Sequence, residues 1–136
     1  MKTLGFDNYI GCGNGLEKEM NCKWLPMDTD LINVTTPKYL NQEGNFVTYY
    51  ITVSGHSPYN SSSRPAKKYL DLVEGEYSTA VKYYLASQIE LDRALEQLIV
   101  EAENVIIMGH TNSDIDCIGS ALGIYRLAKT LKKDRL

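Results

Sequence analysis

The sequence has few cysteines, no long hydrophobic run and little net charge, and each shortage excludes a class of protein. Its three cysteines, Cys12, Cys22 and Cys117, are an odd number without Cys-x-x-Cys spacing. Neither a disulfide framework nor a zinc site is therefore indicated, although Cys12 and Cys22 could pair. No stretch approaches the roughly 20 apolar residues that cross a bilayer. The N-terminus also lacks the apolar core of a signal peptide, so we expect no transmembrane segment in this chain.

The charge balance argues against a nucleic-acid polymer as the partner. Lysine and arginine number 14 and aspartate and glutamate 17, giving a net charge of −3. Binding to a phosphate backbone normally requires a basic surface, which this balance does not provide. The basic C-terminal residues are expected to form the solvated end of a helix, where cations suit the helix dipole. With 136 residues, 43% of them hydrophobic, the chain is long enough for one soluble domain with a core.

The first half of the chain predicts loops and one strand. Residues 1–45 are rich in Gly, Asn and aromatic residues without clear periodicity, which is typical of loops with short elements. Residues 46–53 are all β-branched or aromatic, and they predict a buried strand. The strand is followed by a polar loop, Ser54-Gly55-His56-Ser57-Pro58, and by the turn-like residues 60–65.

The second half predicts a helix, a strand, a loop and a helix. Apolar residues recur at helical spacing between Ser78 and Glu101, with Ser78 or Thr79 available as a cap. A short apolar run over 104–109 predicts a buried strand, and a second helical pattern follows over about 118–131. This order indicates an α/β fold, with an incomplete parallel or mixed sheet and flanking helices. His56 and His110 would then lie at the carboxyl ends of strands, where ligands bind in such sheets.

The loop after the second predicted strand carries the most specific chemistry in the sequence. His110, Asp114 and Asp116 offer one imidazole and two carboxylates within seven consecutive positions. Oxygen-rich sets of this kind favour Mn²⁺, with Mg²⁺ as the alternative. Such an ion activates water and polarises a phosphoryl oxygen, as phosphodiester hydrolysis requires. Gly119 and Gly123 are expected to let the next helix approach this loop. The competing interpretation is that the two aspartates only cap that helix.

The stretch Val105–Gly123, which contains Gly109-His110-Thr111-Asn112-Ser113-Asp114-Ile115-Asp116, resembles the first motif of the DHH phosphoesterase family. It is most similar to the cyclic-di-AMP phosphodiesterases. The resemblance implies that His110, Asp114 and Asp116 bind metal at a two-manganese centre. Ser113 stands where the family usually has proline. The family's remaining ligands are expected downstream of this motif, so we expect weak metal binding or none in this chain.

Residues 4 to about 100 resemble a second family, the lipoteichoic acid synthase-like proteins of the sulfatase and alkaline-phosphatase superfamily. The resemblance rests on Gly5–Tyr9, Asn45–Tyr59 and Tyr83–Leu95. It implies a partial sulfatase-like fold and a phosphoglycerol-type substrate, with His56 contacting the substrate head group. Trp24 is expected to be a partly buried anchor. The nucleophile and metal motifs of that family are not found in this sequence.

Together the resemblances predict two parts, a partial sulfatase-like domain over 1–98 and the start of a DHH domain over 99–136. The leading hypothesis is a fragment of a phosphoglycerol transferase or hydrolase joined to a DHH motif, inactive as it stands. The alternatives are a metal-dependent cyclic-dinucleotide phosphodiesterase fragment, a non-catalytic metal- or phosphate-binding module, a divergent synthase, and a misjoined gene. The first part implies an extracellular, membrane-anchored setting and the second a cytoplasmic one. Unpaired sheet edges would favour self-association.

Overall fold

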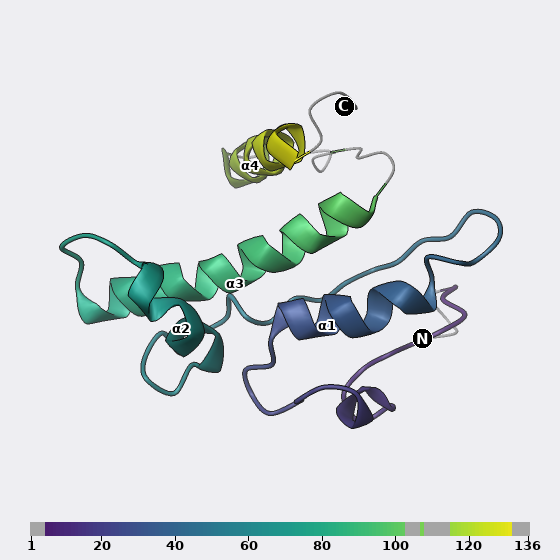
Figure 1. Ribbon diagram of the computed structural model, residues 1–136, viewed down its shortest axis with the longest axis horizontal. Helices are drawn as coiled ribbons and strands as arrows, with labels where there is room; N and C mark the ends of the chain where they lie inside the picture. Colours follow the sequence, from purple (N-terminus) through teal and green to yellow (C-terminus); the bar gives the residue numbers. More distant parts are fainter. Residues whose placement is uncertain (1–4, 103–106, 108–114, 132–136) are drawn as a thin grey trace. The chain divides into compact units, whose positions relative to one another are not determined.

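The structure is a computed structural model, and it describes residues 5–102, 107 and 115–131 (Figure 1). The chain divides into two compact units, Met1–Ala94 and Leu95–Leu136. Among the described residues of the first unit, three α-helices begin: α1 (Asp28–Thr35), α2 (Arg64–Tyr69) and α3 (Thr79–Glu101). The same described residues include the 3-10 helix η2 (Leu16–Lys18) before α1, η3 (Thr36–Lys38) directly after α1, and η4 (Leu70–Leu72) directly after α2. The second unit contains the last turns of α3 and helix α4 (Ile115–Leu131).

Helix α3 forms where the sequence predicts a long amphipathic helix. Ser78 lies just before its first residue, and the Ser78 hydroxyl accepts a hydrogen bond from the Val81 amide at 3.5 Å. No glycine or proline interrupts its 23 residues, which agrees with their high helix propensity. Within the first unit, Ala86, Glu90 and Ala94 are buried at i, i+4 and i+8, which puts them on one face of the helix. The prediction of this helix is confirmed, as is that of α4, which begins three residues earlier than expected.

The predicted α/β fold is wrong for the part of the chain that the structure describes. Its regular elements are all helices, and residues 46–53 form an extended segment without a partner strand. Strand propensity is realised only when a neighbouring strand supplies the hydrogen bonds of a ladder, and no described segment does so here. The expected strand over 104–109 lies outside the described residues except for Ile107, which is not in a strand.

The core of the first unit is small and contains many polar groups. Its fully buried side chains include not only Leu25, Ile32 and Pro65 but also Asp28 and Glu90. A buried carboxylate is costly unless hydrogen-bond donors surround it. The packing of this unit therefore depends on polar contacts as well as on apolar burial.

The glycine-rich loop near the N-terminus is closed by a disulfide bond between Cys12 and Cys22, whose Cα atoms are 5.8 Å apart. The pairing that the sequence left open is thus present in the structure. Inside this loop the amides of Gly13 and Gly15 donate to the Glu17 carboxylate at 2.9 and 3.1 Å. Both glycines have positive φ values, 85° and 102°, which side chains with a Cβ disfavour. Hydrogen bonds from backbone amides, chiefly that of Glu17 itself and that of Gly13, lower the pKa of Glu17.

No helix within the described ranges combines the length and the apolar character needed for a membrane span.

Candidate functional site

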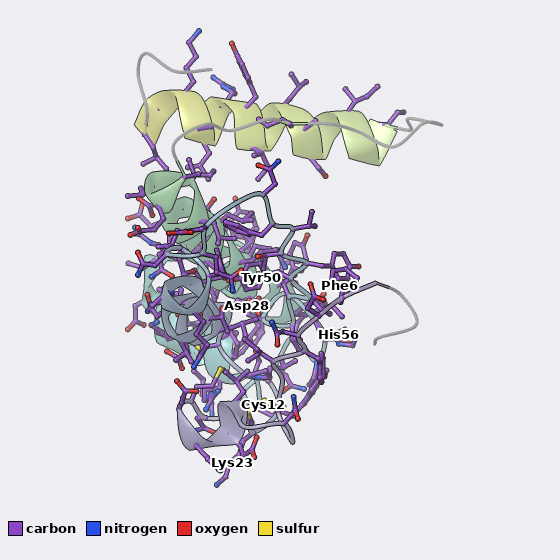
Figure 2. The ribbon with its side chains drawn as sticks, turned by 90° about the vertical axis from the view of Figure 1, so that its right-hand side faces the viewer. Phe6, Cys12, Lys23, Asp28, Tyr50 and His56 are labelled. Carbon is purple, nitrogen blue, oxygen red and sulfur yellow. A yellow bond between two sulfur atoms is a disulfide. The ribbon has the colours of Figure 1, made fainter. Side chains whose placement is uncertain are left out.

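His56 lies in a turn at the end of the extended segment, on the surface of the first unit (Figure 2). The turn is closed by a hydrogen bond from the His56 amide to the Val53 carbonyl at 2.9 Å. Nδ1 of the imidazole lies 2.8 Å from the Ser57 carbonyl oxygen. Because a carbonyl only accepts, this contact favours the tautomer with its proton on Nδ1. Nε2 of the neutral ring is then left as an acceptor on an exposed side chain.

Trp24 is the aromatic neighbour of His56. The ring centroids are 5.3 Å apart and the planes meet at 71°, an edge-to-face arrangement. The expectation that Trp24 is a partly buried anchor is wrong, because 62% of its surface is exposed. The following residue, Leu25, is 1% exposed and takes the anchoring position instead. An apolar ring and an imidazole thus lie side by side on the surface, an arrangement that suits a ligand with both apolar and polar groups.

A buried aspartate fixes the end of the segment that carries His56. Asp28, the first residue of α1, is 1% exposed. Its carboxylate accepts hydrogen bonds from the amides of Val53 and Ser54, each at 2.9 Å, and from the Ser54 hydroxyl. A carboxylate that accepts several hydrogen bonds holds its donors in place strongly, since such bonds are charge-assisted. Asp28, which lies further inside the unit than His56 (Figure 2), therefore holds the turn that carries His56 in place.

A second buried carboxylate, Glu90 of α3, caps α1 from a distant part of the chain. Its Oε1 accepts from the Thr29 amide at 2.8 Å and from the Thr29 hydroxyl at 2.6 Å. A negative charge is favourable there because the first amides of a helix lack partners within the helix. Glu90 Oε2 lies 3.5 Å from the ammonium group of Lys68.

The pKa values of Lys68 and Tyr69, at the end of α2, are both shifted in the surroundings of Glu90. Burial disfavours the charged form of Lys68, but its hydrogen bond with Tyr69 and the charge of Glu90 outweigh that effect, so the pKa of Lys68 is raised. Burial raises the pKa of Tyr69. Lys68 therefore stays a cation and Tyr69 a neutral phenol at neutral pH. The Lys68 ammonium group therefore forms an ion pair with the buried Glu90 carboxylate, and the role of this pair is structural.

The sequence does not predict the role of these two carboxylates. The loops with short elements expected over residues 1–45 do not specify α1, which begins at Asp28. The available signal was an aspartate at a helix start, but its partners lie 25 and 26 positions away. Glu90 occupies an ordinary position in an amphipathic helix, and no local pattern separates it from an exposed glutamate.

The predicted metal ligands lie mostly outside the described residues. His110 and Asp114 fall there, and Asp116 is described only as part of the first turn of α4. Their grouping around a metal stays a prediction. In the described ranges, no three His, Cys, Asp or Glu side chains lie close enough together to hold an ion. An ideal Cβ at Gly119 or Gly123 has no described atom within 4 Å, so the structure gives no support to the close approach expected at these glycines.

Comparison with known proteins finds similarity over about a third of the chain. No family model matches, and no solved structure matches significantly. A stretch of 44 residues, 32% of the chain, is 46% identical to the cyclic-di-AMP phosphodiesterase GdpP of Bacillus subtilis. A stretch of 39 residues is 44% identical to the cyclic-di-AMP phosphodiesterase PdeA of Listeria monocytogenes. These stretches cover only 7% and 6% of the two relatives. The comparisons support the DHH-type part of the sequence interpretation, and none of them supports the sulfatase-type part.

Proposed function

We propose that the C-terminal part of this chain supplies metal ligands for a phosphodiesterase that acts on cyclic dinucleotides. The observation that carries the proposal is the 46% identity over 44 residues to a cyclic-di-AMP phosphodiesterase. The residues assigned to the metal are His110, Asp114 and Asp116. Because the match covers 7% of that relative, the activity and the substrate of a whole enzyme are part of the proposal.

The chemistry of the donor set fits Mn²⁺. One imidazole nitrogen and the oxygens of two carboxylates suit a borderline-hard divalent ion that prefers oxygen-rich surroundings. The ion would polarise a phosphoryl oxygen and lower the pKa of a bound water. Helix α4 begins at Ile115, so the assigned ligands lie just before or within its first turn. The first amides of the helix contribute partial positive charge near a phosphate group.

Metal binding can be tested separately from catalysis. The 136-residue chain is titrated with Mn²⁺ while its melting temperature is measured, because an ion that binds the folded state raises that temperature. The assignment predicts weak binding, so we expect a small increase at high Mn²⁺ concentration that Asp114→Ala and Asp116→Ala each reduce. Asp71→Ala is the matched control, since Asp71 lies in η4, remote in sequence from the motif. An absent shift, or an equal shift in all variants, refutes the ligand assignment.

The substrate is tested by incubating the same chain with Mn²⁺ and cyclic-di-AMP. We expect no turnover by this chain alone, because three side chains supply only part of a two-metal centre. Addition of cyclic-di-AMP should still change the Mn²⁺-dependent melting temperature, since phosphate oxygens complete the coordination of a partly liganded ion. If the nucleotide has no effect in the presence of bound Mn²⁺, the proposed substrate is wrong while the metal assignment stands.

A second candidate function is the binding of a phosphorylated head group at His56. The observation in its favour is the exposed pair of His56 and Trp24, with Nδ1 held by the Ser57 carbonyl. The chain has one tryptophan, so its fluorescence reports directly on this surface. Titration with glycerol phosphate should change that fluorescence in the native chain and not in His56→Ala. An equal change in both, or none in the native chain, removes this candidate.

A further inference from the structure

Residues 43–52, which the function above does not use, form a long open segment between η3 and α2 (Figure 1). The segment contains no helix or strand, and every residue in it except Tyr50 is exposed. None of these residues makes a backbone–backbone hydrogen bond with another described residue. The next amide, that of Val53, donates to the Asp28 carboxylate at 2.9 Å. The main chain of residues 43–52 is therefore free for a partner to bind.

A main chain without internal hydrogen bonds is the form that an endoprotease binds. The substrate lies in the active site as an extended strand, and its backbone groups form hydrogen bonds with the enzyme. A helix must open before it can be bound in this way, so its cleavage depends on the population of the open form. Residues 43–52 have no helical hydrogen bonds to break. Cleavage within the segment therefore needs no prior unfolding of the first unit.

Tyr49 is the side chain of this segment that is most open to an aromatic-binding pocket. It is 73% exposed, more than any other described aromatic side chain. Phe46 is less accessible, because its ring packs against that of Tyr39 with the centroids 5.4 Å apart. Tyr50 is half-buried, and its hydroxyl lies 2.8 Å from that of Thr35. A protease that recognises a large aromatic side chain is therefore directed to Tyr49.

We propose that the bond between Tyr49 and Tyr50 is a cleavage site for an endoprotease whose primary pocket takes a large aromatic side chain, and that the first unit stays assembled after the cut. Water adds to the carbonyl carbon of Tyr49, and the bond to the Tyr50 nitrogen breaks. The nitrogen takes up a proton and becomes an amine, while Tyr49 keeps a carboxylate. The products are residues 1–49 and 50–136.

The two products are joined by contacts that do not depend on the cleaved bond. The hydrogen bonds between them pair Asp28 with Val53 and Ser54, Thr29 with Glu90, Thr35 with Tyr50, and the Asn21 carbonyl with Arg64. Those to the two buried carboxylates are charge-assisted and therefore strong. Buried apolar side chains also come from both products, for example Ile32 and Ala86. The disulfide between Cys12 and Cys22 lies within the first product and does not join the two.

The test digests the 136-residue chain briefly with chymotrypsin and identifies the products by mass spectrometry. Among the bonds that follow an aromatic residue, the one after Tyr49 should be cut first. Tyr49→Ala should slow this cut by at least about tenfold, because the apolar pocket then lacks its side chain. Tyr77→Ala, at another exposed aromatic position (50% exposed), should leave the rate of this cut unchanged. Tyr49→Lys should make the same bond a substrate for trypsin.

The cut chain is then passed through a gel-filtration column without denaturant and again in urea. Both products should elute together without denaturant and separately in urea. An earlier cut after another aromatic residue, or equal slowing by Tyr77→Ala, refutes the cleavage site. Products that separate without denaturant refute the retained assembly. Far-UV circular dichroism before digestion checks that the variants keep their helices, and if Tyr49→Ala does not fold, resistance of Tyr49→Lys to trypsin at this bond is the refuting result.

Discussion

Removal of the Asp28 carboxylate should destabilise the first unit more than any other single change at the start of α1. The carboxylate accepts from the Val53 amide, the Ser54 amide and the Ser54 hydroxyl. Ser54 is 0% exposed, so Asp28→Ala leaves two of its donors buried without an acceptor. Each buried unpaired group costs about 1–3 kcal/mol, which gives a loss of about 2–6 kcal/mol. This is a large fraction of the roughly 5–15 kcal/mol that stabilises an ordinary domain.

The assay is urea unfolding followed by far-UV circular dichroism, with the disulfide bond kept intact. Asp30→Ala is the matched control, because Asp30 also lies in the first turn of α1 but is half-exposed. It should change the free energy of unfolding by less than about 0.5 kcal/mol, as most surface substitutions do. Asp28→Asn, which keeps one acceptor oxygen, should fall between the two. If Asp28→Ala and Asp30→Ala have equal effects, the carboxylate does not hold the segment in the way described.

Three further predictions concern the N-terminal loop and α4. Replacing Cys12 and Cys22 by serine should lower the free energy of unfolding by about 2–3 kcal/mol, because the disulfide closes a short loop; an unchanged urea midpoint would refute this. Gly119→Ala should stabilise α4 by about 0.5–1 kcal/mol, since its Cβ meets no described atom; a lower helical signal would show that the position is crowded. The folded-state pKa of Glu17 lies below the ordinary 4.5, so its stabilising effect is present above the unfolded pKa and lost as pH falls through the folded one. Carbon NMR titration should show this lowered midpoint, and a midpoint at the ordinary value would contradict the contacts with Gly13 and Gly15.

Local sequence patterns predicted the long helices and failed wherever a distant partner decides the outcome. The periodicity of residues 78–101 was sufficient to predict α3, because the backbone hydrogen bonds of a helix form within the helix itself. The segment 46–53 has the composition of a strand, yet no described neighbour completes a ladder, so the α/β prediction failed. Six of its eight side chains are exposed, where a buried strand was expected.

In the candidate sites, too, local features can be read from the sequence, whereas contacts between distant residues cannot. The place of His56 after an apolar segment can be read from the sequence, but its role as a substrate contact is implied only by the sulfatase-type resemblance and stays a prediction. The exposure of Trp24 beside it depends on how residues 24 and 56 come together in space. The buried pair of Asp28 and Glu90 depends on contacts up to 61 residues apart, which no local pattern specifies. The metal motif at His110, Asp114 and Asp116 is read from the sequence and its similarity alone, and it stays a prediction.

The contact between Glu90 and Thr29 has a consequence for the order in which the chain folds. Helix α1 has eight residues, too few to be stable alone in water. Its capping carboxylate comes from α3, so α1 acquires this support only after a long loop has closed. We expect α3 to belong to the folding nucleus and α1 to form late. Substitutions in α1 should then accelerate unfolding and leave the refolding rate almost unchanged.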